Sequence, residues 1–244
     1  MSHAAANPPS APGQLPHDFD HVHSDVSGGW LRAATFGAMD GLVSNTALIA
    51  GVAASVSADV ILVSGFAGLL AGAFSMALGE YTSVSTANDQ IDAEVAVEHR
   101  AFAAHPDAER AELVDLLVGL GMTAQTAQRA SDEIHQNEDS AVNFHLALEI
   151  GVNPREKPSA RLAAISSFVM FAIGAVIPLI PYLLGYDSLW AGLACAGAGQ
   201  VTAGALATRF TGKSAWWAAF RQLAFGAVAV AATYHIGWLV AKLV

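Results

Sequence analysis

The sequence predicts an all-α fold: a polytopic membrane protein with five transmembrane helices and a helical insert between the second and the third. Three observations support this prediction. Hydrophobic residues make up 54% of the 244 residues, charged residues only 13%, and the mean hydropathy is +0.44. Five windows reach the ~20 apolar residues that a helix needs to cross a hydrocarbon core of ~30 Å. Between the second and third windows, residues 88–157 hold 14 of the 21 acidic residues.

The five apolar windows are nearly free of charge. Asp40 is the one charged residue in the first, and the other four contain none, although His235 lies in the fifth. Pro178 and Pro181 are expected to kink the end of the third window. The pair Gly68-xxx-Gly72 is expected to let another helix approach closely. The windows are Ala33–Val56, Val60–Gly79, Leu162–Leu184, Leu189–Thr208 and Gln222–Ala241.

The acidic insert, residues 88–158, is predicted to be a small helical bundle. Five basic against 14 acidic residues give residues 88–157 a formal charge of −9, almost the whole −10 of the chain. The expected helices are the second span continued to about Ala104, one from Pro106 to Gly121, one capped by Thr123 and ending near Gln136, and one over Ser140–Ile150. The chain thus divides into a disordered His- and Asp-containing tail (1–29), spans one and two (30–87), the insert (88–158), and spans three to five (159–244).

The positions of Lys and Arg predict the orientation, because these residues accumulate on the cytoplasmic side of a membrane. The N-terminus and the acidic insert are expected in the cytoplasm and the C-terminus outside. Short loops and the lack of organellar targeting favour a bacterial plasma membrane. In the tail, His17–Asp25 is a weak candidate metal collector. The residues on the expected inner side are Arg32, Arg155, Lys157, Arg161, Arg209, Lys213 and Arg221, against Lys242 outside.

Asp40 is the first candidate functional residue inside the membrane. A carboxylate within a span costs ~2.5–3.5 kcal/mol, so it normally faces a cavity, a partner or an ion. The alternative is a buried aspartate bonded to Ser44 or Asn45. On the second span, Met76 and Glu80 are four residues apart and share a helix face. A thioether with carboxylates suits Fe²⁺ or Mn²⁺, although a methionine on a span more often serves packing.

The insert carries pairs of metal-ligating residue types at helical spacing. Residues three or four apart lie on one helix face, where like charges repel each other. Any one of these carboxylates could simply be solvated, but the whole set favours a divalent-metal site. The pairs are Glu94 with Glu98, Glu109 with Glu112, and His145 with Glu149.

Several stretches between Gly28 and the C-terminus resemble the vacuolar iron transporters and their bacterial relatives. This resemblance implies five spans and a dimer with the pathway at or near the subunit interface. It also implies export of Fe²⁺, often Mn²⁺, from the cytosol against protons, and an insert that binds metal through glutamates. The stretches are Gly29–Arg32, Asp40–Asn45 through Val52, Ala71–Tyr81, the Glu-rich insert and Ile177–Tyr182.

The resemblance also implies roles for individual residues. Asp40 matches the family's intramembrane carboxylate and Met76 its pathway methionine. Three positions depart from the family: Ala101 and Gly68 stand where it has glutamates, and His145 stands where its eukaryotic members have a methionine. Glu94 and Glu80 are nearby carboxylates that could compensate. The family's insert glutamates match Glu98, Glu109, Glu112 and Glu149.

Together these features predict a proton-coupled Fe²⁺ or Mn²⁺ exporter and not an enzyme. The expected partners are metal ions, protons, the lipid bilayer and a second copy of the chain. We expect no prosthetic group and no nucleic acid. One alternative is a membrane-bound metal sensor or buffer without transport. Another is a di-iron ferroxidase, which would need two Glu-x-x-His motifs; the nearest pattern is a single Asp132-x-x-His135.

Overall fold

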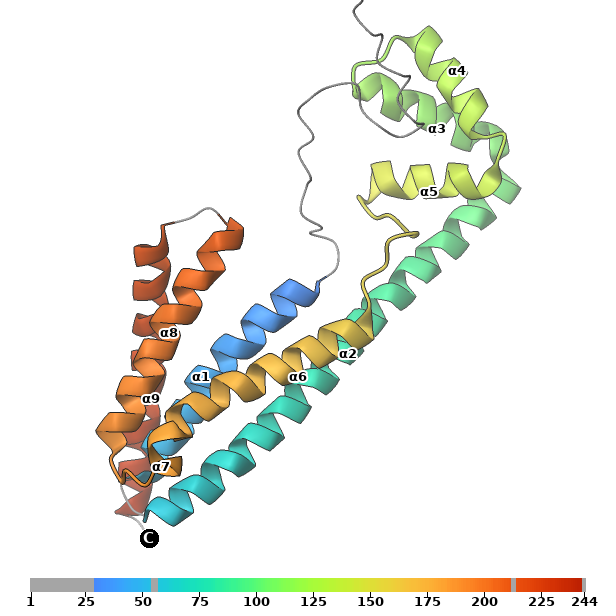
Figure 1. Ribbon diagram of the computed structural model, residues 1–244. Helices are drawn as coiled ribbons and strands as arrows, with labels where there is room; N and C mark the ends of the chain where they lie inside the picture. Colours follow the sequence, from blue (N-terminus) through green and yellow to red (C-terminus); the bar gives the residue numbers. More distant parts are fainter. Residues whose placement is uncertain (1–28, 54–56, 212–213, 243–244) are drawn as a thin grey trace, which may run out of the picture.

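The computed structural model describes residues 29–53, 57–211 and 214–242, and within these ranges every regular element is a helix (Figure 1). The predicted all-α class is therefore confirmed. The candidate metal collector His17–Asp25 and the rest of residues 1–28 lie outside the described ranges. The elements are α1 (Trp30–Ala53), α2 (Ala58–Ala104), α3 (Pro106–Gly119), α4 (Ala124–Ile134), α5 (Glu138–Glu149), α6 (Ala160–Val176), a 3₁₀ turn (Ile177–Leu179), α7 (Ile180–Leu183), α8 (Leu189–Thr211) and α9 (Ala215–Ala241).

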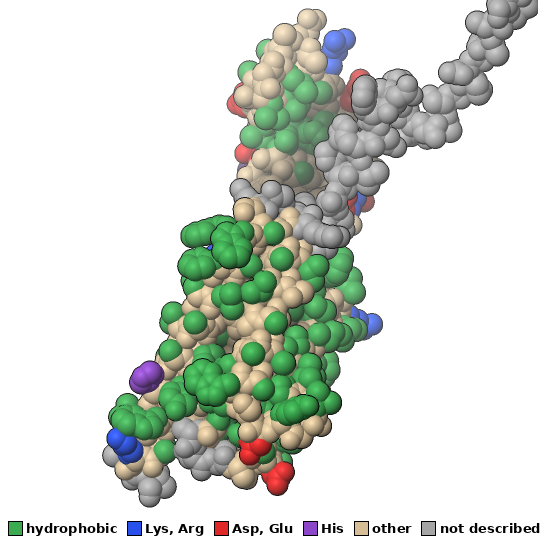
Figure 2. All heavy atoms as spheres, turned by 60° about the vertical axis from the view of Figure 1, so that its left-hand side comes forward, with side chains coloured by type: hydrophobic (Ala, Val, Ile, Leu, Met, Phe, Trp, Pro, Cys, Tyr) green, Lys and Arg blue, Asp and Glu red, His purple; other side chains and the backbone are tan. Residues whose placement is uncertain are grey.

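Five helical segments in the described ranges are long and apolar enough to cross a membrane, as predicted. They are α1, the first part of α2, α6 continued through α7, α8 and α9. Figure 2 shows hydrophobic side chains spread over the face of the bundle that α8 and α9 form. An apolar outer surface is what lipid contact requires, since lipid tails cannot satisfy polar groups.

The two prolines of the third span interrupt its helix near the end of the span, as predicted. Helix α6 ends at Val176, and the span finishes as the 3₁₀ turn containing Pro178 and the short α7 containing Pro181. Proline lacks the backbone N–H and its ring clashes with the preceding turn, so a regular α-helix cannot run through both positions.

Helices α1 and α6 pack backbone against backbone. A Cβ on Gly41 would lie 2.2 Å from the carbonyl oxygen of Phe171, and a Cβ on Gly174 would lie 2.3 Å from that of Ala38. At Gly72 of α2 the nearest neighbour is instead the Phe171 ring, 2.2 Å from the Cβ position. At Gly72 the space left by the missing side chain is therefore filled by a side chain of another helix and not by its backbone. Backbone-to-backbone contact occurs instead between α1 and α6.

Helix α2 connects the membrane bundle to the insert. Its 47 residues make it about 70 Å long at 1.5 Å per residue, more than twice a hydrocarbon core of ~30 Å. Figure 1 shows its far end carrying α3, α4 and α5. The predicted continuation to Ala104 is confirmed, and Pro106 opens α3.

The insert is the helical bundle that its sequence predicts. The Thr123 side chain accepts a hydrogen bond from the Thr126 amide and caps α4, and Asn137 caps α5 in the same way. Leu113 and Leu117 of α3 pack on Ala127 of α4 to form its apolar core. Helices α3 and α5 both contact α2. Three helices, α2, α3 and α5, therefore meet where the insert joins α2.

Candidate metal centre

Three buried ligand residues from three helices meet where the insert joins α2. Glu98 lies near the end of α2, Glu109 in the first turn of α3, and His145 in the middle of α5. Their ligand atoms all lie within 4.8 Å of one another. Their exposed fractions are only 8%, 9% and 0%. The sequence predicted all three, and the fold brings them together.

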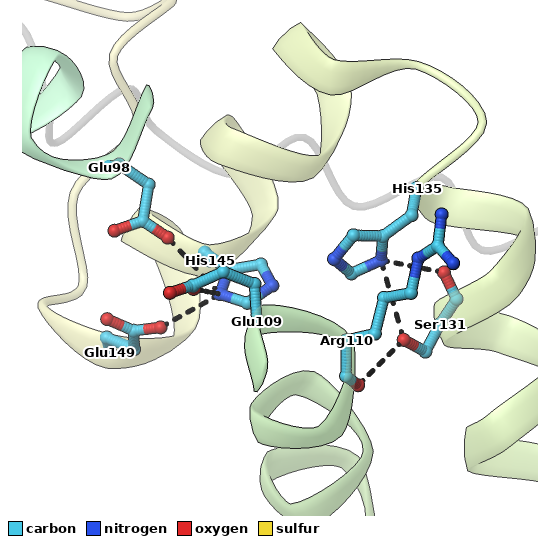
Figure 3. A network of polar contacts seen from close by, with 7 residues as sticks. All are labelled: Glu98, Glu109, Arg110, Ser131, His135, His145 and Glu149. Carbon is cyan, nitrogen blue, oxygen red and sulfur yellow. Dashed lines mark hydrogen bonds and ion pairs between the residues drawn. The ribbon is translucent and has the colours of Figure 1, made fainter. Parts of the chain in front are cut away.

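The His145 imidazole is the centre of this group (Figure 3). Its Nδ1 lies 3.3 Å from Oε1 of Glu98 and 3.8 Å from Oε2 of Glu109. Glu149, one turn further along α5, adds a third carboxylate with Oε1 at 3.0 Å. We call Glu98, Glu109, His145 and Glu149 the ligand cluster.

Burial, and after it charge repulsion within the ligand cluster, raises the pKa values of two of its acids. The pKa of Glu98 is raised to about 7, first by burial and then by the charges of Glu149 and Glu109. The pKa of Glu109 is also raised, by burial and by Glu112, although His145 opposes this shift. Several carboxylates that share a buried site resist simultaneous ionisation. A bound divalent cation would remove that repulsion.

Glu94 and Glu112 lie at the rim of the ligand cluster. Both are exposed, and neither belongs to the group of converging ligand atoms in the described part of the chain. Both nevertheless raise the pKa of Glu98 through their charge. Of the six predicted insert residues, four therefore converge on one site. Glu94 and Glu112 affect that site only through their charge.

The donor set suits a divalent transition metal. Carboxylate oxygens with one imidazole nitrogen are ligands that Mn²⁺, Fe²⁺ and Zn²⁺ accept. Oε1 of Glu98 is buried and has no hydrogen-bond partner. Buried polar atoms are normally satisfied, so an orphaned carboxylate oxygen beside an imidazole favours a cation as its missing partner.

A second group of predicted residues lines a cavity within the spans. Asp40 of α1 and Met76 of α2 both line it, and its volume is about 330 Å³. The hydroxyl of Ser44 donates to the backbone carbonyl of Asp40, so it does not satisfy the carboxylate. The other lining residues are Ser44, Asn45, Leu48, Gly68, Gly72, Ser75 and Phe171. We call this the intramembrane cavity.

Glu80 does not line the intramembrane cavity. Its carboxylate accepts a hydrogen bond from Arg32, with Nη2 and Oε2 3.0 Å apart. The arginine belongs to the first turn of α1, so the pair joins α1 to α2. Of the two residues predicted to share a face of α2, Met76 lines the cavity and Glu80 forms an ion pair.

Two residues with a place at these sites were not among the predicted ligands. Asn45 donates to the carbonyl oxygen of Ala175 at 2.6 Å, which leaves its buried Oδ1 without a partner beside the cavity. His135, directly after α4, lies beside the ligand cluster, with its ring edge-to-face against that of His145. Asn45 lies within the family-like stretch that begins at Asp40, which was a usable signal. Nothing in the spacing of His135 indicates its neighbours.

The five apolar helices define an integral membrane protein, and its buried ligand cluster is a candidate site for a divalent metal. The chain belongs to the VIT family, whose model matches residues 31–238. It is 30% identical over 221 residues to vacuolar iron transporter 1 of Oryza sativa subsp. japonica, covering 88% of each chain. It is 33% identical over 228 residues to the vacuolar iron transporter of Acanthamoeba castellanii, covering 90% of this chain and 82% of the relative. The identity to vacuolar iron transporter 1 of Arabidopsis thaliana is 29% over 222 residues, with 88% of each chain covered.

Proposed function

We propose that this protein is a proton-coupled transporter that moves Fe²⁺, with Mn²⁺ as a second cargo, out of the cytoplasm. The main support is that one helix, α2, carries both Glu98 of the ligand cluster and Met76 of the intramembrane cavity. The names of the relatives support iron as the cargo. A site that only stored metal would have no use for Asp40 inside a span.

In this proposal the insert gathers metal and the cavity passes it across the membrane. Glu98 and Met76 are 22 residues apart on α2, or about 33 Å at 1.5 Å per residue. That distance excludes a shared ion, so metal must leave the ligand cluster before Asp40 and Met76 receive it. A proton arriving at the Asp40 carboxylate would then weaken its hold on the metal and favour release on the far side.

We also propose how the protein is oriented in the membrane and how it assembles. The N-terminus and the acidic insert face the cytoplasm and the C-terminus lies outside, supported by the Lys and Arg distribution. The working unit is a homodimer, as the family resemblance implies. We place the protein in a bacterial plasma membrane, although its relatives from Oryza sativa and Arabidopsis thaliana are named as vacuolar transporters.

Metal and proton flux in proteoliposomes test the transport proposal. The purified protein is reconstituted, a pH gradient is imposed, and Fe²⁺, Mn²⁺, Co²⁺ and Zn²⁺ uptake is followed together with internal pH. Asp40→Asn keeps the side-chain shape but removes the charge, so it should abolish metal-driven proton flux. Asp59→Asn is the matched control, because Asp59 is exposed in the first turn of α2 and should leave both fluxes unchanged.

Two results would contradict the proposal in different ways. Transport by Asp40→Asn at the wild-type rate would remove Asp40 from the pathway. Metal binding to the reconstituted protein without any uptake would favour the sensor or buffer alternative.

A further inference from the structure

His135 lies against the back of the ligand cluster. It follows the last residue of α4, and its ring stacks on Phe102 of α2 with centroids 5.2 Å apart. Its ring also meets that of His145 nearly at right angles, with centroids 5.4 Å apart. Phe102 and His145 are themselves 5.1 Å apart, so the three rings form one closed group.

The hydrogen bonds of His135 determine which of its nitrogens carries the proton. Its Nδ1 lies 2.8 Å from the backbone carbonyl oxygen of Ser131, which can only accept. The Ser131 hydroxyl donates to the carbonyl of Arg110, so toward His135 it too can only accept. Nδ1 must therefore be the donor, and Nε2 of the neutral ring keeps its lone pair.

The His145 ring has the opposite requirement. Its Nδ1 faces the carboxylates of the ligand cluster, so a metal held there would take the Nδ1 lone pair. The ring proton must then sit on Nε2, which is fully buried. A metal-bound histidine almost always donates its other N–H to a hydrogen-bond acceptor. Among the residues that the structure describes, no acceptor is bonded to this Nε2.

With metal on Nδ1 of His145, its Nε2 would need an acceptor, and Nε2 of His135 is an acceptor in need of a donor. Both are buried and without a partner, and Figure 3 shows the Nε2 edges of the two rings turned toward each other. We propose that His135 is a positioning residue for metal binding: its Nε2 accepts the Nε2 proton of His145 and so presents the Nδ1 lone pair of His145 to the metal. This rests on the proposed metal site in the insert.

With this hydrogen bond, a continuous series of contacts runs from the backbone to the metal site. The carbonyl of Ser131 orients His135, His135 orients His145, and His145 faces the three carboxylates. Partners of this kind typically change metal affinity 10–100-fold. The Phe102 ring cannot replace His135 in this role, because a π face is a much weaker acceptor than a nitrogen lone pair.

Mn²⁺ binding to the full-length protein in detergent tests the proposal. Bound Mn²⁺ is obtained from the loss of the free-ion electron paramagnetic resonance signal, in an Asp40→Asn background so that the insert is measured alone. His135→Phe keeps the stacked ring but removes the acceptor, and should lower affinity at least tenfold. His135→Gln offers an amide oxygen near the position of Nε2 and should stay within about threefold of the background affinity, a smaller change than the 10–100-fold loss expected when such a partner is removed. His99→Phe is the control, since His99 lies outside the ligand cluster and pairs with Glu138.

Nuclear magnetic resonance provides a second test, which does not require His135→Phe to fold. In ¹⁵N-histidine-labelled protein loaded with diamagnetic Zn²⁺, His145 should be protonated on Nε2 and show a nitrogen–nitrogen coupling to His135 across the hydrogen bond. Absence of this coupling, or a folded His135→Phe protein within twofold of the background affinity, would overturn the proposal. Glu98→Gln distinguishes a failure of the proposed metal site from a failure of the proposed role of His135. If that variant binds Mn²⁺ as well as the background does, the metal site itself is wrong; if it loses binding while His135→Phe does not, only the role of His135 is wrong.

Discussion

The guanidinium of Arg32 lies 3.0 Å from the carboxylate of Glu80 and ties the first turn of α1 to α2. The arginine side chain is 66% exposed and the glutamate side chain only 10%. The pair lies one helical turn beyond Met76, where α2 leaves the intramembrane cavity. Glu80 therefore has a partner within the protein, and its structural role can be tested separately from the ligand role that its position suggested.

Glu80→Gln is expected to lower stability and to leave metal binding unchanged. A pair with one well-exposed partner contributes up to about 1 kcal/mol, which corresponds to a drop of about 2–4 °C in the thermal midpoint for a chain of this size. Arg32→Gln should have the same effect, and the double variant should be no worse than either single one, because both remove one interaction. Thermal unfolding and Mn²⁺ binding in detergent measure both properties. Loss of metal transport in Glu80→Gln but not in Arg32→Gln would instead make Glu80 a ligand.

Gly41→Ala is expected to disrupt the packing of α1 on α6. The added methyl would meet the backbone oxygen of Phe171 at 2.2 Å, and backbone cannot rotate away as a side chain can. Overpacking of this kind costs at least about 1–3 kcal/mol, so folded yield and thermal midpoint should both fall. Gly79→Ala is the matched control: nothing lies within 4 Å of its Cβ position, and alanine favours helix by up to ~1 kcal/mol. Equal midpoints for the two variants would contradict this packing.

The spans, the long second helix and the pairing of His145 with Glu149 were predictable from the sequence because they follow from local rules. Apolar windows of membrane length, Pro106 after a helix end and Thr123 as a cap each depend on a few neighbouring residues. The i, i+4 spacing of His145 and Glu149 also places them together whatever surrounds them.

The remaining details depend on how distant helices meet. Glu80 is 48 residues from Arg32, and nothing in its spacing from Met76 distinguishes a ligand from half of an ion pair. His135 reaches the ligand cluster only because α4 and α5 fold back onto the end of α2. The backbone contact of Gly41 depends on α6, more than a hundred residues further along the chain. Periodicity identifies the face of a helix but not the partner of that face.

Glu112→Gln and Glu98→Gln are expected to differ in size and in salt dependence. In the proposed metal site Glu98 supplies a buried ligand atom, so its loss should weaken Mn²⁺ binding by more than tenfold at any ionic strength. Exposed Glu112 acts through its charge alone, so its loss should cost only a few-fold, and that cost should shrink near 1 M salt, where the screening length is ~3 Å. Mn²⁺ titrations of both variants at low and high salt measure the difference. A large, salt-independent loss in Glu112→Gln would place its carboxylate among the ligands.

Metal affinity is expected to rise with pH, because metal and proton compete for Glu98. The pKa of this residue in the metal-free protein is about 7, so below that pH the metal must displace a proton. Displacing one proton changes affinity about tenfold per pH unit, and the slope should flatten above pH 7. Mn²⁺ titrations from pH 5.5 to 8.5 measure this. Glu98→Gln should lose most of the slope, whereas Glu133→Gln, an exposed change on α4, should keep it.

The stability of the metal-free protein should change with pH in the opposite direction. The pKa of Glu98 is raised from its ordinary value of 4.5 to about 7, so the folded state holds this proton more tightly than the unfolded chain. The stabilisation is complete below pH 4.5 and is lost as the pH rises through 7. Glu98→Gln mimics the protonated acid, so it should raise the thermal midpoint over wild type at pH 8 and not at pH 5. A midpoint difference of the same size at both pH values would show that ionisation of Glu98 does not strain the empty ligand cluster.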